Sequence, residues 1–191
     1  KRDGSFLVSR KENKDFKWTD LKGSTIIPGR KGGVPYMTFE YVLKQNGIDT
    51  KNEVVLDDSI KFDLMAGAFA GGTADYVTLF EPTALGLEKE GKGYVVTSVG
   101  KYSKEVPFTS YYVTKDYLNE NSDLLQRFTN ALYKAQKFVM ESTDEEVAKA
   151  IQPFFTETSI EDLTEVIKRY RNADVWCETP YFKEDGLNRL M

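Results

Sequence analysis

Histidine is absent from this chain of 191 residues, and cysteine occurs once, as Cys177. Without histidine the chain cannot build a Ser-His-Asp or Cys-His catalytic centre, and it lacks both the commonest general base and the commonest metal ligand. A single cysteine excludes an internal disulfide and any zinc or iron–sulfur site made of several cysteines. Catalysis through carboxylates or lysine is still open, but these absences favour a protein that binds without reacting.

Long apolar runs and an excess of positive charge are missing as well. No run of apolar residues is long enough to cross a bilayer. The formal net charge is −4, from 26 basic and 30 acidic residues, which argues against nucleic acid as the main partner. A hydrophobic content of 40% and an aromatic content of 13% support a packed core, and the length fits one large domain or two small ones.

Residues 26–35, IIPGRKGGVP, are the most informative stretch of the chain. They predict a short strand, a glycine-rich turn and a helix opened by proline. The amino end of a helix attracts anions, glycines let a ligand approach the backbone closely, and Arg30 and Lys31 add positive charge. In the alternative interpretation this is a plain strand-to-helix turn, in which Gly32 and Gly33 only relieve backbone strain. The pattern alone does not decide between the two.

Short strands alternate with helices in the first half of the chain. We expect strands at residues 25–27, 53–56, 76–80 and 94–99, and helices at residues 35–46, 62–70 and 82–90. This order predicts right-handed βαβ crossovers and a parallel sheet. Ligands bind beyond the carboxyl ends of such strands, so we expect the loops at residues 28–34, 57–59 and 80–82 to face one crevice.

The second half is mainly helical, after a break near residues 100–110. Residues 107–114, PFTSYYVT, predict an extended segment, and Ser122, Thr143 and Ser159 are expected to cap the helices that follow. These helices carry amphipathic stripes but have few strands to cover. We therefore expect them to need a further partner surface.

Three side chains near predicted strand ends or on the extended segment are candidates for ligand contact. Glu81 could accept hydrogen bonds from a ligand, or it could cap the helix that Pro82 opens. Phe80 could stack on a ring or lie in the core. Tyr111, with Phe108 nearby, could grip a flat ligand or pack as part of a strand. No paired carboxylates show acid–base spacing, so we assign no catalytic residue and no metal ligand.

Several motifs together resemble the substrate-binding proteins of ABC transporters, in the NMT1/THI5-like group with its SsuA-like, thiamine-precursor and nitrate types. The motifs are DLKGSTII at residues 20–27, LKQNGID at 43–49, AFAGGTAD at 68–75, LFEP at 79–82, PFTSY at 107–111, RFTNAL at 127–132 and DVW at 174–176. In the motif LFEP, Phe80 stands where the family has tryptophan.

The resemblance implies a type II periplasmic-binding-protein-like α/β fold, in which two lobes close over a solute. Residues 12–106 would form the second lobe, with a parallel or mixed sheet flanked by helices. Residues 1–11 and 107–191 would form the hinge crossings and the C-terminal helices of the first lobe. The N-terminal sheet of that lobe has no counterpart in this sequence, so we expect a truncated first lobe. The chain begins at Lys1 without methionine or signal peptide, which indicates a removed targeting segment or a fragment.

The resemblance also implies the function of an extracytoplasmic solute-binding component, either periplasmic or a lipoprotein. It would deliver a small polar or anionic nutrient to an ABC permease and be monomeric when full-length, with no cofactor, metal or nucleic acid. The expected solute contacts are Arg30, Lys31, Gly32, Gly33, Tyr36, Phe80, Glu81 and Tyr111. One alternative is a pyrimidine-precursor synthase of the THI5 type, which needs a catalytic histidine and a cysteine cluster that this sequence lacks. Another is the effector-sensing domain of a transcription regulator.

Overall fold

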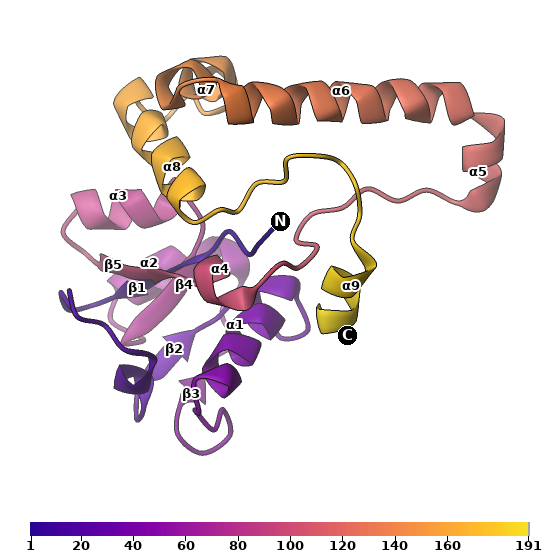
Figure 1. Cartoon of the computed structure of the whole chain (residues 1–191). Coiled ribbons are helices and arrows are strands. Elements are labelled where there is room, and N and C mark those ends of the chain that lie inside the picture. Colours follow the sequence, from indigo (N-terminus) through magenta and orange to yellow (C-terminus); the bar gives the residue numbers. More distant parts are fainter. Residues whose placement is uncertain (191) are drawn as a thin grey trace.

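The computed structural model describes residues 1–190 and shows an α/β part followed by a helical part (Figure 1). The strands are β1 (Phe6–Ser9), β2 (Thr25–Ile27), β3 (Val55–Leu56), β4 (Tyr76–Leu79) and β5 (Tyr94–Ser98). The α-helices are α1 (Val34–Gln45), α2 (Met65–Ala70), α3 (Thr83–Lys89), α4 (Gly100–Ser103), α5 (Lys115–Glu120), α6 (Ser122–Glu141), α7 (Asp144–Ile151), α8 (Ile160–Asn172) and α9 (Glu184–Leu190). Short 3₁₀ turns are η1 (Trp18–Leu21), η2 (Phe62–Leu64) and η3 (Gln152–Phe154).

The five strands form one mixed sheet in the order β3-β2-β4-β1-β5. β2 is parallel to β3 and to β4, as the alternation of strands and helices predicts. β1 is antiparallel to β4 and to β5, so the sheet is mixed, which is one of the two forms that the resemblance implies, and not purely parallel as the alternation of strands and helices alone predicts. The reason is that residues 10–24, between β1 and β2, hold only the turn η1 and no crossover helix. Part of the expected hinge crossing at residues 1–11 is therefore an inner strand of the sheet.

Helices cover both faces of the sheet, and each face has its own core. Val8 and Ile27 belong to a buried cluster with α2 and α3, whereas their neighbours Leu7 and Ile26 belong to a cluster with α1. Successive side chains of a strand point to opposite faces, which explains this division. The α/β part thus buries both surfaces of its sheet.

The predicted elements of the α/β part are confirmed, with small shifts at their ends. α1 has Pro35 in its first turn, and Gly47, with a φ of 73°, follows its end. The helix expected at residues 62–70 is divided into the turn η2 and the helix α2. Residues 107–114 form a link between α4 and α5 that belongs to no helix and pairs with no strand, in agreement with the extended segment predicted there.

In the helical part, α6 lies across the molecule away from the sheet, whereas α8 returns to the side of α3 (Figure 1). The hydroxyls of Thr143 and Ser159 accept hydrogen bonds from the first turns of α7 and α8, which confirms both predicted caps. Ser122 is instead the first residue of α6, with Asn121 at the cap position, because α5 ends at Glu120 and leaves a link of one residue.

Candidate functional site

Three loops leave the same edge of the sheet, because β2, β3 and β4 are parallel and their carboxyl ends lie together. These loops are residues 28–33 after β2, residues 57–61 after β3 and residues 80–82 after β4. The three loops expected to line one crevice therefore start from the same end of the sheet.

The first loop is the glycine-rich turn. Gly29 and Gly32 have φ angles of 92° and 79°, a left-handed conformation that side chains rarely adopt. Gly33 occupies the cap position of α1 and has no side chain to bond to the amides of the first turn. Arg30 and Lys31 are exposed beside this helix end. Positive side chains and a helix amino end both favour negative charge.

The second loop approaches the start of α1. Burial raises the pKa of the Tyr36 hydroxyl, and the carboxylates of Glu40 and Asp58 raise it further. Asp58 follows β3, at the same end of the sheet from which the glycine-rich turn leads into α1. The neighbouring carboxylate of Asp57 accepts hydrogen bonds from Ser59, at 2.6 Å from the hydroxyl and 3.0 Å from the amide, and these bonds lower the pKa of Asp57.

The third loop begins with an aromatic contact. The Phe80 ring lies with its centroid 5.8 Å from that of Phe62 and 5.6 Å from that of Phe108. Phe62 is 59% exposed, so this row of three rings is open at one end. Phe80 is half-buried at a strand end and packs on two neighbouring rings of the protein, while its stacking on a ligand ring stays a prediction.

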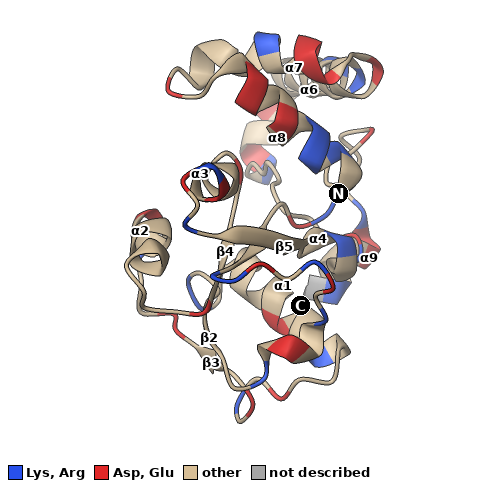
Figure 2. Ribbon diagram, turned by 90° about the vertical axis from the view of Figure 1, so that its left-hand side faces the viewer, with Lys and Arg blue, Asp and Glu red and all other residues tan. Residues whose placement is uncertain are grey.

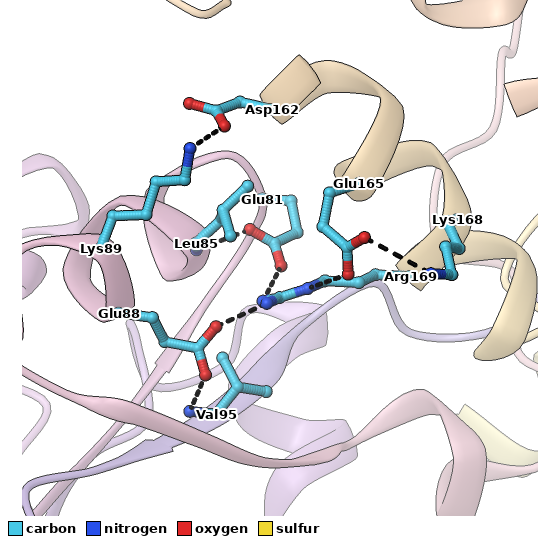
Figure 3. A network of polar contacts seen from close by, with 9 residues as sticks. All are labelled: Glu81, Leu85, Glu88, Lys89, Val95, Asp162, Glu165, Lys168 and Arg169. Carbon is cyan, nitrogen blue, oxygen red and sulfur yellow. Dashed lines mark hydrogen bonds and ion pairs between the residues drawn. The ribbon is translucent and has the colours of Figure 1, made fainter. Parts of the chain in front are cut away.

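Glu81 points inward and is held by the protein's own donors (Figure 3). One carboxylate oxygen accepts from the Leu85 amide at 2.8 Å, and the other is 3.0 Å from the Arg169 guanidinium. The side chain is fully buried, and burial raises the pKa of its carboxyl group. The capping role weighed from the sequence is therefore present. In this structure the carboxylate is not open to a ligand amine or hydroxyl.

Tyr111 lies away from the strand ends, on the extended link to α5. It is 69% exposed, and its ring packs edge-on against Phe128 of α6 with a centroid distance of 5.1 Å. Both residues line a groove of about 980 Å³ between this link, α6 and residues 177–186. Phe108 also lines the groove, and its contact with Phe80 connects the groove to the third loop.

The structure thus brings six of the eight candidate residues to one edge of the sheet and turns one of those six, Glu81, inward. The six at the edge are Arg30, Lys31, Gly32, Gly33, Phe80 and Glu81, while Tyr36 lies in the first turn of α1 and Tyr111 lies in the groove. Sequence reasoning did not find Phe62 or Arg169, since neither stands in a motif or near its partner in the sequence. Contact of these residues with a solute stays a prediction.

Two further properties bear on the kind of site. Among residues 1–190, no group of three or more histidine, cysteine, aspartate or glutamate side chains is arranged to hold a metal ion. In the same residues, we find no helix with the length and apolar character needed to span a membrane.

Comparison with known proteins identifies the family of this chain. Residues 8–152 match the NMT1-like family. YtlA of Bacillus subtilis, named as a candidate binding protein, is 40% identical over 182 residues, which are 95% of this chain and 54% of that protein. The chain therefore spans about half the length of this curated relative.

Solved structures share the fold. The alkanesulfonate-binding protein SsuA of Xanthomonas axonopodis, bound to MOPS, superposes with a TM-score of 0.67 over 87% of this chain and 55% of that one, at 14% identity. The periplasmic aliphatic sulphonate binding protein SsuA of Escherichia coli gives a TM-score of 0.56 over 89% of this chain and 52% of that one, at 16% identity. At such identities the likeness establishes the periplasmic-binding-protein-like fold.

Proposed function

The chain belongs to the NMT1-like family, and we propose that it is the solute-binding part of an ABC-type import system. It captures a small polar or anionic nutrient outside the cytoplasm, as a periplasmic protein or a lipoprotein, and passes it to a membrane permease. It carries out no reaction. The likeness in fold to two sulfonate-binding proteins supports this class of function.

One observation carries the proposal: the glycine-rich turn, the amino end of α1 and the loop after β3 converge at one edge of the sheet. The amino end of α1, the backbone near Gly32 and the charges of Arg30 and Lys31 suit an anionic group. The Gly33 amide, which donates to the Arg30 carbonyl at 3.0 Å, would have to exchange that bond for one to the solute. The hydroxyl of Tyr36 adds a donor close to the same helix end.

The apolar end of the site suits the remainder of such a solute. Phe80 and Phe108 offer ring faces between the strand ends and the groove. An alkanesulfonate combines an anionic head with an apolar tail, so it matches both ends of this arrangement. Tyr111, farther along the groove, is proposed to contact the solute only when the lobes close.

The lobe arrangement is part of the proposal. We take residues 12–106, together with β1, as the core of the solute-binding lobe, and α5 and α6, which line the groove, as part of the first lobe. The solute is held between the two lobes, which close about the extended segments that connect them. The full-length protein acts as a monomer.

The test is calorimetry on the full polypeptide that contains this chain, with MOPS and ethanesulfonate as probes. A thermal-shift screen extends it to nitrate, riboflavin and thiamine precursors. We expect saturable binding of at least one sulfonate. Absence of binding or stabilisation by any of these compounds would contradict the proposed solute class.

Charge-removing variants locate the site. Arg30→Ala and Lys31→Ala should each weaken sulfonate binding by about two- to fivefold, the effect of one charge near a helix end, and added salt should reduce the difference. Lys51→Ala is the matched control, because Lys51 is an exposed lysine in the turn beyond the opposite end of α1. Equal effects of the three substitutions would place the anion elsewhere.

A further inference from the structure

The helix α8 is bound to the α/β part by an ionic network at the corner that follows β4 (Figure 3). The guanidinium of Arg169 lies 3.0 Å from a carboxylate oxygen of Glu81, 2.6 Å from one of Glu88 and 3.4 Å from one of Glu165. Glu81 and Glu88 come from the α3 region, while Glu165 lies on α8 itself. Arg169 therefore links the corner, α3 and α8 through one side chain.

Tyr170 adds a second link to the same corner. Its hydroxyl accepts a hydrogen bond from the Glu81 amide at 3.0 Å. Its ring lies 5.8 Å from that of Phe6 on β1 and 5.7 Å from that of Trp176. Burial raises the pKa of Tyr170 to about 12, so the hydroxyl stays protonated at neutral pH.

Apolar packing joins the end of α8 to the sheet. Ala173 and Val175 are buried in the same cluster as Phe6 and Val8. The start of α7 is fixed to α8 in turn, because the Arg171 guanidinium binds the Asp144 carboxylate at 2.6 Å. α7 and α8 therefore form one packed unit with the α/β part.

α6 differs from α8 in this respect. None of its residues is buried, although it is the longest helix described, with 20 residues. It meets the rest of the described chain through its ends and through side chains that line the groove. The division between a fixed part and a projecting part thus falls between α6 and α7.

We infer that α7 and α8 belong to the solute-binding lobe, and that Arg169 and Tyr170 are positioning residues for the Phe80–Glu81 corner. Phe80 directly precedes the amide and carboxylate that these two side chains hold, so they fix the direction of its ring. That Arg169 and Tyr170 influence solute binding rests on the proposed function. That they hold the Phe80–Glu81 corner in place does not depend on it.

The test is hydrogen exchange measured by mass spectrometry on the unliganded protein, in a peptide covering residues 79–86. Tyr170→Phe removes the acceptor for the Glu81 amide and should raise exchange in this peptide by about tenfold, the equivalent of about 1.4 kcal/mol, with no change in peptides from α1. Arg169→Met should give a larger increase, and Arg169→Lys should restore part of the protection, since lysine pairs as a point charge.

Lys89→Gln is the matched control. It removes the ion pair between Lys89 and Asp162, which joins α3 to α8 at an exposed position, and should leave the corner peptide unchanged. An unchanged corner peptide in Tyr170→Phe, or an equal rise in peptides from α1, would overturn the inference. If Arg169→Met fails to fold, Tyr170→Phe and Lys89→Gln still decide it.

Titration with MOPS then separates the inference from the proposed function. Faster exchange at the corner together with about fivefold weaker MOPS binding in Tyr170→Phe supports both. Faster exchange with no binding even by the unsubstituted protein supports the positioning role and refutes the sulfonate site. Equal binding by Tyr170→Phe and the unsubstituted protein would refute any influence of the corner on the solute.

Discussion

The carboxyl group of Asp3 should make the stability of this protein fall as the pH rises from 4 to 7. The residue lies just before β1 and is wholly buried. One of its oxygens accepts hydrogen bonds from the amide and hydroxyl of Ser5, the amide at 2.7 Å, while the other oxygen has no partner among the described residues. Burial outweighs the bonds from Ser5 and raises the pKa of Asp3 from 3.8 to about 6.

The size of the effect follows from this shift. Between pH 4 and pH 6 the folded state binds more protons at Asp3 than the unfolded state, so the free energy of unfolding falls as the pH rises. A rise in pKa from 3.8 to about 6 corresponds to about 3 kcal/mol, present below the unfolded pKa and lost once the pH exceeds the folded pKa. Asp3→Asn removes the titrating group and should remove this component.

Urea unfolding of the unsubstituted protein and Asp3→Asn at several pH values between 4 and 8 measures the component. The difference in unfolding free energy between the two proteins should change by about 2.4 kcal/mol across this range, slightly less than the full component because pH 4 lies just above the unfolded pKa, and the change should favour the variant at high pH. Any loss from the new amide is independent of pH and cancels in this comparison. Asp15→Asn, at an exposed position, is the control for loss of one negative charge. Parallel pH profiles for the unsubstituted protein and Asp3→Asn would refute the reasoning.

Three other substitutions test local features, each by urea or thermal unfolding. Gly100→Ala should destabilise the protein by about 3 kcal/mol or prevent folding, because an added Cβ would stand 1.9 Å from the Asp3 carbonyl oxygen. Gly86→Ala, in α3 with no atom within 4 Å of an added Cβ, should instead stabilise by about 0.5–1 kcal/mol, and a loss would contradict this account. Thr143→Ala should cost about 1 kcal/mol by removing the acceptor for the Glu146 amide, and an unchanged stability would show that the cap is redundant.

Local sequence patterns predict most elements of the α/β part, because their causes are local. The apolar spacing of α1, its Pro35 and the Gly47 after it specify a helix and both its ends. The segment FLVS, expected as part of a hinge crossing, forms the buried strand β1 instead, and its four residues carry no information on pairing direction or neighbours. Its antiparallel place between β4 and β5 follows from pairing with segments about 70 and 90 positions away, which a local pattern does not encode.

The candidate site shows the same limit. The glycine-rich turn was predictable because its glycines, its charges and the proline after it lie within ten residues of one another. The burial of Glu81 was not, since Arg169 is 88 positions away and stands in a helix whose sequence gives it no special spacing. The row of Phe62, Phe80 and Phe108 likewise joins three distant segments, and only the fold brings them into contact.

An anion site at this edge is compatible with a chain of net charge −4. The carboxylates of Glu81 and Asp57, near the strand ends, already accept hydrogen bonds from donors of the protein. Glu81 is paired with Arg169 and the Leu85 amide, and Asp57 is bonded to Ser59. Asp58 is exposed, where water and salt screen its charge. At the turn the Gly33 amide donates to the Arg30 carbonyl at 3.0 Å, whereas the side chains of Arg30 and Lys31 are exposed and add positive charge beside the helix end. If the proposed anionic solute binds at this edge, it meets the charges of Arg30 and Lys31 there, so we expect charge removal at the turn to weaken binding and Lys51→Ala to leave it unchanged.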